Sequence, residues 1–377
     1  MLNVLAYVHL RRIVKSTGAG RAARCLTENL AACGGTDVRV LGDSGDYQRI
    51  APEAGPSWTG LKHYLFPRDT SSQQARWLFL ARPTAEAWWP DVQVTLCTSE
   101  SYVPVKRSRL VVTLNDAAHL EPQAHRRGLS ILKQRMKWNC LYRVLERKAD
   151  LLHTASTFSA ERLAHFWPGM RDRLRVVPHG TPQRFFEPPS QEALDSVRVL
   201  GLEPRQFVLL PCGLDHRKNG DLVLSAWKTI RELLPGLKLI VTSNASDPSY
   251  LERAKAHGDS IVIPGHVTDD VMCALYHSAA VVWFPSRYEG FGLPILEAMA
   301  CGAPVISSNC TSIPEVAGDC ALLLPTDDTG AHIDAIRSFV TSSAVADQWR
   351  VKGPDRARQY TWANSARKMR TLLEALV

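Results

Sequence analysis

The 377-residue sequence lacks the features that mark membrane-spanning and secreted proteins. No apolar run reaches the ~18 residues that a membrane-crossing helix needs. Residues 1–8 are apolar but too short for a signal peptide, and they have no leading positive charge, so they predict a buried first strand. There is no repeat of 20–50 residues and no low-complexity tract, which excludes a solenoid or a disordered chain.

Metal-binding and disulfide patterns are also missing. The nine cysteines have no C-x-x-C spacing, and no two aspartates stand at D-x-D spacing. An odd, irregular set of cysteines without a signal peptide predicts reduced thiols in the cytoplasm, most of them small core residues. We therefore expect no metal and no bound cofactor.

The charge balance favours an anionic partner. Lys and Arg number 45 against 37 Asp and Glu, a net charge of +8. This excess fits a sugar nucleotide, a lipid phosphate, a membrane surface or a nucleic acid, and by itself does not choose among them. No aromatic–basic recognition motif is present, so we do not expect nucleic acid.

Short β-branched runs alternate with helical stretches along the whole chain. This alternation predicts parallel sheets covered on both faces, and two sets of runs predict two doubly wound α/β domains. The seam is expected within 185–204, where Pro188, Pro189 and Pro204 interrupt regular structure. The predicted strands are 2–8, 37–41, 94–97, 110–114, 150–153 and 174–177 in the first set, and 207–212, 237–242, 260–263, 280–284, 304–308 and 321–324 in the second.

One region, 57–90, has a poor pattern but is dense in tryptophan. One interpretation is aromatic packing under a long loop, and the other is a surface that contacts an acceptor. The last segment, 363–377, has helical spacing of its apolar residues.

The strongest candidate site follows the predicted strand 280–284. Glu289-Gly290-Phe291-Gly292-Leu293 leads into a predicted helix over 295–301, so it lies where open α/β sheets bind ligands. Glycines allow close approach of the backbone, and the N–H groups of the helix start favour an anion such as a diphosphate. Glu289 would then accept hydrogen bonds from sugar hydroxyls, and Glu297, one helical turn into the helix, would hold a ribose.

The alternative is a helix N-terminus with two incidental glutamates. The run E-G-F-G-L-P-I-L-E-A-M-A-C-G-A-P-V-I, however, resembles the E-x7-E signature of the retaining glycosyltransferases of family 4. That resemblance implies the GT-B fold, with two Rossmann-like doubly wound domains that face a cleft. It implies an acceptor-side domain over 1–188, a donor-binding domain over 189–360, and a last helix over 361–377 that packs back on the first domain.

The segment 213–219 resembles the family's G-x-x-x-x-K/R-K-N motif. Its Arg217 and Lys218 would then neutralise the diphosphate as negative charge grows on the leaving group, which agrees with metal-independent catalysis. The alternative is a solvated basic turn. The segment 265–270 resembles the loop that faces the base, and 309–316 resembles a mainly structural segment.

The first domain resembles the family more loosely. Gly18 and Gly20 match a glycine-rich loop expected after the first strand, near phosphate and acceptor; a loop without ligand contact is the alternative. Asn115-Asp116 stands where many members have His-Asp, and asparagine cannot take a proton. His119 is either a substitute or a packed histidine. The segment 155–159 resembles a helix-capping S-x-x-S.

A basic amphipathic helix is predicted over 129–148, directly after Arg126-Arg127. One interpretation is peripheral contact with an anionic membrane through 126–148, at the inner face of the plasma membrane near a lipid-linked acceptor. The other is a core-facing helix with a solvated basic face.

The sequence thus predicts a cytoplasmic, retaining glycosyltransferase that moves a hexose from a nucleoside-diphosphate sugar to a carbohydrate or lipid-linked acceptor. The family implies synthesis of a surface polysaccharide or glycolipid. Among possible donors, GDP-mannose is the first candidate. The alternatives are a nucleotide-sugar epimerase or a phosphorylase on the same fold, or a catalytically idle sugar-nucleotide-binding protein.

Overall fold

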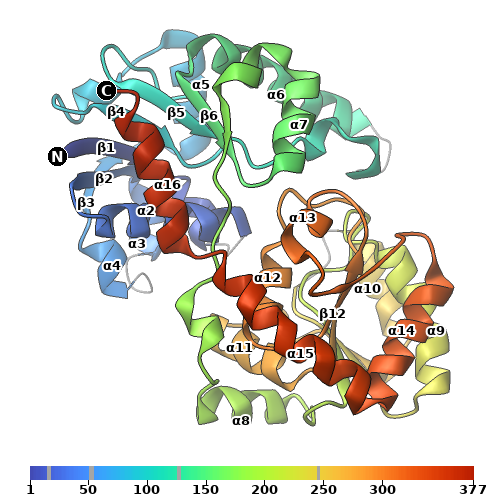
Figure 1. Ribbon diagram of the computed structural model, residues 1–377. Helices are drawn as coiled ribbons and strands as arrows, with labels where there is room; N and C mark the ends of the chain where they lie inside the picture. The colour runs from blue at the N-terminus through green and yellow to red at the C-terminus, as the bar shows by residue number, and fades with distance from the viewer. Residues whose placement is uncertain (15–17, 51–54, 125–128, 244–246) are drawn as a thin grey trace. The chain divides into compact units, whose positions relative to one another are not determined.

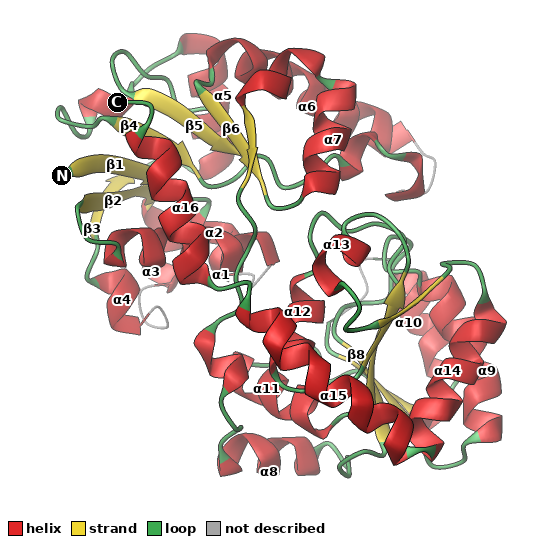
Figure 2. Ribbon diagram, in the orientation of Figure 1, coloured by secondary structure: helices red, strands yellow, loops and turns green. Residues whose placement is uncertain are grey.

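The computed structural model covers residues 1–377 and describes all of them except 15–17, 51–54, 125–128 and 244–246 (Figure 1). The chain forms two compact units. The first unit contains Met1–Leu120, Gly128–Gly180 and Trp362–Val377, and the second contains Glu121–Arg127 and Thr181–Thr361. Each unit is built on its own parallel sheet flanked by helices (Figure 2).

The sheet of the first unit has seven parallel strands in the order β3-β2-β1-β4-β5-β6-β7. β1 lies between β2 and β4, where Val4 is opposite both Val38 and Val94. The order reverses between β1 and β4, so the carboxyl ends of these two strands mark the switch point at which such sheets bind ligands. The strands are β1 Leu2–Tyr7, β2 Thr36–Asp43, β3 Lys62–Phe66, β4 Val94–Cys97, β5 Arg109–Thr113, β6 Leu151–Thr154 and β7 Leu174–Val176.

Strand β3 is the one strand in the described part of the chain that the sequence did not predict. It lies at the edge of the sheet, and only Phe66 of its five residues is buried, so it carries neither an apolar run nor an alternation. The tryptophans around it are core residues: Trp58 and Trp77 are fully buried, and Trp77 donates to the carbonyl of Pro83 at 3.0 Å. The structure therefore favours aromatic packing in this region.

Helix α16, at the end of the chain, packs against α2 of the first unit (Figure 1). Its buried residues Ala366, Met369 and Leu373 form one stripe, as the spacing predicts. Hydrogen bonds also hold the helix in place, from Ser365 to the carbonyl of Pro178 and from Arg370 to that of Gly34, each 2.5 Å. The helices of the unit are α1 Leu10–Val14, α2 Gly18–Ala32, α3 Ser44–Ile50, α4 Gly55–Thr59, α5 Thr70–Leu80, α6 Leu129–Lys148, α7 Thr157–Phe166 and α16 Trp362–Glu374.

Helix α6 lies where the amphipathic helix was predicted, and the apolar residues of its C-terminal half pack into the core of the first unit. Leu141 and Leu145 are buried in the core, with Tyr142 between them, whereas Met136 is exposed. Arg126, Arg127 and the side chains of 129–134 lie outside the described residues. Membrane contact through 126–148 stays a prediction, and the apolar stripe near Leu141 is not available for it.

The sheet of the second unit has six parallel strands in the order β10-β9-β8-β11-β12-β13. In the middle of this sheet Val282 of β11 lies opposite Leu209 of β8 and Val305 of β12. The switch point lies between β8 and β11. The strands are β8 Phe207–Leu210, β9 Lys238–Val241, β10 Ile261–Val262, β11 Val281–Phe284, β12 Val305–Ser308 and β13 Leu322–Leu324.

The long segment of the second unit begins at Thr181, before the prolines where the sequence predicted the domain boundary. The short 3-10 helix Gln183–Phe186 packs on the unit's own helices, because Phe185 is fully buried against Tyr276 at 6.0 Å between ring centroids. The helices of the unit are α8 Gln191–Val199, α9 Gly220–Leu233, α10 Pro248–Lys255, α11 Asp269–Ser278, α12 Leu293–Ala300, α13 Ile313–Ala317, α14 Thr329–Thr341 and α15 Ser343–Arg358.

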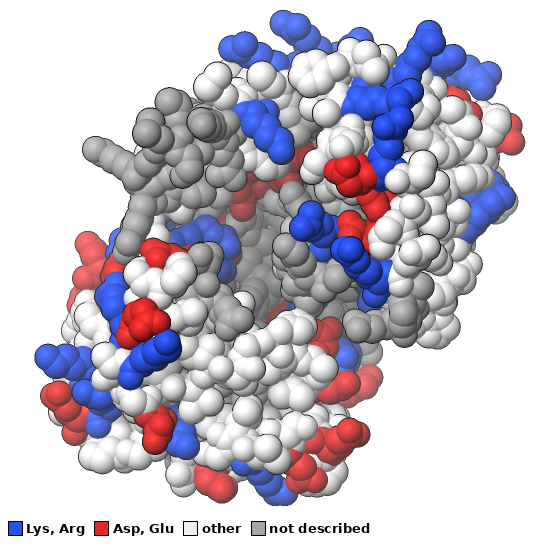
Figure 3. Space-filling model, turned by 180° about the vertical axis from the view of Figure 1, so that it is seen from behind, with Lys and Arg blue, Asp and Glu red and all other residues white. Residues whose placement is uncertain are grey.

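Surface charges of both signs are interspersed on the face shown in Figure 3. Exposed ion pairs also lie along helices of the second unit, such as Arg198 with Asp195 at 2.8 Å and Arg337 with Asp334 at 2.9 Å. Within the part of the chain that the structure describes, no helix has both the length and the apolar character needed to cross a bilayer.

Candidate functional site

The switch point of the second unit is formed by two loops, 211–219 after β8 and 285–292 after β11. Because β8 and β11 are adjacent and parallel, both loops leave the same edge of the sheet. The backbone N–H of Arg287 donates to the carbonyl of Arg217 at 2.8 Å, which holds the loops together. The structure thus places Arg217, Lys218 and Glu289, which are about 70 positions apart in sequence, in one site.

Glu289 is the centre of this site, and its carboxylate pairs with both cations. Lys218 Nζ lies 2.5 Å from Oε1, and a guanidinium nitrogen of Arg217 lies 3.4 Å from Oε2. The Glu289 side chain is 9% exposed, that of Lys218 12% and that of Arg217 34%. The sequence assigned the carboxylate to sugar and the cations to diphosphate, and in this structure the three groups contact one another.

Two opposing effects act on the Glu289 carboxyl. Burial alone would raise its pKa, but the charges of Lys218 and Arg217 and the hydrogen bond from Lys218 outweigh burial, so that the pKa is lowered. Glu289 is therefore an ionised hydrogen-bond acceptor at neutral pH, which suits a group that binds hydroxyls.

The loop around Glu289 is held by the segment 309–316, which the sequence described as mainly structural. Thr311 Oγ1 accepts from the Glu289 N–H at 3.2 Å, and Ser312 Oγ donates to the carbonyls of Glu289 and Phe291 at 2.9 and 3.0 Å. Asp215 likewise fixes Lys218, whose N–H it accepts at 2.8 Å. The sequence placed these residues in segments that resemble the family's but did not predict their contacts, because hydroxyl and carboxyl contacts across loops leave no spacing signal.

Helix α12 starts directly after the glycine-containing loop. Gly292 is its N-cap with φ 107°, and Phe291 and Leu293 on either side are buried. The eight-residue helix Leu293–Ala300 directs its positive end toward the loop that bears Gly290 and Glu289. Glu297 lies one turn into the helix, is 3% exposed, and accepts from the Tyr276 hydroxyl at 3.3 Å.

Gly292→Ala is expected to lower the free energy of unfolding by about 1–3 kcal/mol, because its φ of 107° is a backbone conformation that residues with a Cβ rarely adopt. An added Cβ would lie 3.4 Å from the nearest atom of Ile295, which is an ordinary van der Waals contact. The cost therefore arises from the backbone conformation and not from a clash. Urea unfolding measures the effect. The control Gly330→Ala has an ordinary φ and should be neutral or stabilising by up to about 1 kcal/mol; equal effects of the two substitutions would contradict this account.

The glycines of the first unit differ from the expected loop. A short helix, α1, follows β1, and Gly18 and Gly20 form the first turn of α2. Gly18 is exposed and Gly20 is buried. The expectation of a glycine-rich loop after the first strand was wrong, because Gly18 and Gly20 belong to the first turn of helix α2. Gly18 and Gly20 are still at the carboxyl side of β1, at the switch point.

Asn115 and Asp116 follow β5 and are held by local contacts. Glu100, which follows β4, accepts from both the backbone N–H and the side-chain amide of Asn115, at 2.7 and 2.8 Å. Asp116 accepts from the N–H of Ala118 at 2.8 Å. Glu100 was not found from the sequence, although its position after a neighbouring strand was an available signal.

His119 is a packed histidine. Its ring lies 5.3 Å from that of Trp138 and 5.0 Å from that of Tyr142, between the centroids. The helix-capping prediction is confirmed: Ser156 is the N-cap of α7 and accepts from the N–H of Ser159 at 3.1 Å.

Two doubly wound parallel sheets, with a basic, glycine-containing site at a switch point, define the GT-B class. The family described as glycosyl transferases group 1 matches residues 205–342. "O-antigen chain mannosyltransferase B" from Escherichia coli is 30% identical over 274 residues, which cover 70% of this chain and 69% of that protein. The chain belongs to the glycosyl transferases group 1 family.

Two further comparisons bear on the extent of the likeness. "Serotype-specific mannosyltransferase WbdA" from Escherichia coli is 29% identical over 228 residues, which cover 58% of this chain but only 28% of WbdA. The structure of HepE from Anabaena in complex with UDP-glucose superposes with a TM-score of 0.76 at 15% sequence identity. The alignment covers 100% of this chain and 100% of HepE. At that identity the structural likeness shows the shared fold.

Proposed function

We propose that this glycosyltransferase moves a hexose from a nucleoside-diphosphate sugar to a carbohydrate or lipid-linked acceptor with retention of anomeric configuration. The observation that carries the proposal is the buried contact of Glu289 with Lys218 and Arg217 at the switch point. One carboxylate for hydroxyls and two cations for a diphosphate are the groups that a sugar nucleotide requires.

The donor would lie along the start of α12. Its diphosphate would contact the backbone of Gly290–Leu293 together with Lys218 and Arg217, its sugar would be held by Glu289, and its ribose by Glu297. Arg217 and Lys218 would be fixed cations next to the departing diphosphate and would stabilise the charge that develops there without a metal.

The reaction would exchange one bond for another on the same face of the sugar. The anomeric carbon–diphosphate bond breaks, the bond to the acceptor oxygen forms, and the acceptor's proton passes to the leaving diphosphate. Gly18, Gly20, Asn115 and Asp116 would line the acceptor side. Asn115 is held through Glu100 and its amide cannot take up a proton, so its role would be positioning.

The relatives favour mannose, in a GDP-linked donor, and synthesis of a surface polysaccharide or glycolipid in the cytoplasm. Two of them are named mannosyltransferases, and one of these names refers to an O-antigen chain. HepE was solved with UDP-glucose, so a UDP-linked donor is the rival choice.

A thermal-shift screen against nucleotides and sugar nucleotides tests the donor. A ligand present at 100 times its dissociation constant stabilises the protein by about 2.7 kcal/mol, so the true donor should stand out. We expect GDP-mannose to raise the melting temperature more than GDP, UDP-glucose or free mannose, without added divalent metal. A screen in which no sugar nucleotide raises it would contradict the proposed function.

A further inference from the structure

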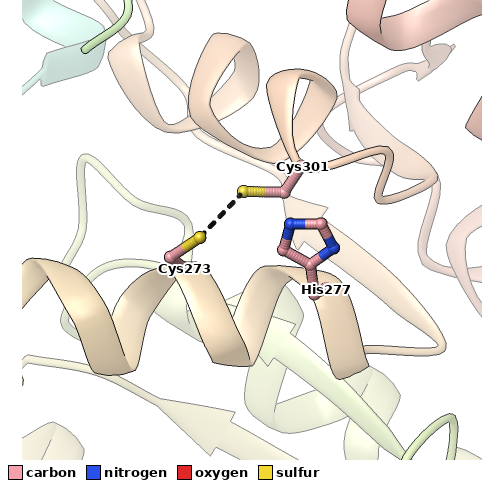
Figure 4. A group of neighbouring side chains, drawn as sticks. All are labelled: Cys273, His277 and Cys301. Carbon is pink, nitrogen blue, oxygen red and sulfur yellow. Dashed lines mark hydrogen bonds between the residues drawn. The ribbon is translucent and has the colours of Figure 1, made fainter. Parts of the chain in front are cut away.

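Three side chains with metal-binding atoms meet between α11 and the end of α12. Cys273 and His277 are four residues apart on α11 and so lie on the same side of that helix. Cys301 is the C-cap of α12. Figure 4 shows the imidazole of His277 beside the two sulfur atoms, and one ligand atom from each residue lies within 4.8 Å of the others. The sequence showed no such cluster, because two helices far apart in sequence supply its members.

The spacing of the two sulfur atoms fits two ligands of one metal ion. They lie 3.9 Å apart, with both cysteines buried. In tetrahedral coordination with Zn–S bonds of about 2.3 Å, two sulfur ligands stand about 3.8 Å apart. A disulfide requires about 2.05 Å, so the cluster would have to move to form one.

A hydrogen bond between two thiols would explain the sulfur atoms but not the histidine. Nε2 of His277 is buried and has no hydrogen-bond partner among the residues that the structure describes. An unpaired polar nitrogen in the interior destabilises the fold, and metal ligation is one way to satisfy it. A ligand set of two thiolates and one imidazole binds zinc(II) in preference to hard cations, which favour oxygen ligands.

We propose that Cys273, His277 and Cys301 bind one zinc(II) ion, with a water molecule in the fourth position. Within the described part of the chain, the cluster contains these three protein ligands. The ion would tie α11 to the end of α12. Tyr276 of α11 donates to Glu297 of α12 at 3.3 Å, so the tie would keep together the two helices that make this contact. The ion would stabilise the unit and take no part in the transfer reaction.

The reduced, chelator-treated whole chain tests the proposal directly. Titration with zinc(II) in competition with a chromogenic chelator should show that the chain binds one equivalent of zinc(II) tightly. Thermal unfolding with zinc(II) present should show a raised melting temperature. Cobalt(II) should give the thiolate-to-metal charge-transfer and visible bands of a tetrahedral site with sulfur ligands. If the wild-type chain takes up no tight equivalent, or its cobalt spectrum lacks thiolate bands, the proposal is overturned; neither result depends on the folding of a variant.

Single substitutions then locate the ion. Cys273→Ser, His277→Gln and Cys301→Ser should each weaken zinc(II) binding by more than about 10-fold, since even changes beyond the ligands cost 10–100-fold. Cys320→Ser removes a buried cysteine of the same unit outside the cluster and should leave affinity unchanged. Equal affinity of all four folded variants would overturn the assignment.

Discussion

Glu289→Gln is expected to lower turnover by about 100-fold or more, the loss typical for removal of one preorganised electrostatic group. Glutamine keeps the shape and one acceptor oxygen but removes the charge that pairs with Lys218 and Arg217 and that would bind the donor's sugar hydroxyls. The effect should fall on kcat, because the carboxylate would act where the anomeric bond breaks. Steady-state release of nucleoside diphosphate in the presence of acceptor measures it.

The matched control is Glu252→Gln, which neutralises an exposed carboxylate paired with Lys255 at 2.8 Å. It should leave kcat within twofold of the wild type. Thermal unfolding of both variants establishes that they are folded. Unchanged turnover in a folded Glu289→Gln variant would refute the assignment of this residue to the donor site.

Lys218→Met is expected to lower the free energy of unfolding by about 3 kcal/mol, which is the lower end of the range for breaking a buried ion pair. The lower end applies because Arg217 remains 3.4 Å from Glu289 and still compensates part of its charge. Methionine has a similar length, so the loss comes from charge. Of the groups that lower the pKa of Glu289, Lys218 has the largest effect, and without it that pKa should rise. Urea unfolding at neutral pH measures the stability.

A double variant separates charge from packing. Lys218→Met with Glu289→Gln removes both charges and should recover most of the loss, because no buried carboxylate is left without its lysine. The exposed control Lys255→Met should cost less than about 1 kcal/mol. If the double variant is as unstable as the sum of the two singles, the pair is not coupled and this view of the site is wrong.

The sequence predicted most of the fold because the strands are buried on both sides. Runs such as Val281–Phe284 are wholly apolar, so they stand out from the amphipathic helices around them. β3 was missed for the opposite reason: it is an edge strand with one buried residue. A loop was expected at Gly18 and Gly20 because glycines are poor helix formers in the interior of a helix, yet here they stand in the first turn of α2.

The candidate site was predictable where one segment carries it, as in the run from Glu289 to Glu297. The contact between Glu289 and Lys218 was not, since it depends on the adjacency of β8 and β11 in the folded sheet. The same holds for Glu100 with Asn115 and for Cys301 with Cys273. Residue type and local spacing indicate a role, and the order of strands decides which residues meet.

The most direct test of the central claim is identification of the reaction product. The chain is incubated with the sugar nucleotide that stabilises it most and with a mannose-terminated acceptor, and the product is analysed by mass spectrometry and NMR. We expect a new glycosidic bond with the anomeric configuration of the donor, formed without added metal. An epimerised sugar nucleotide, a sugar phosphate or an unchanged acceptor across a panel of carbohydrates and lipid-linked sugars would contradict the account.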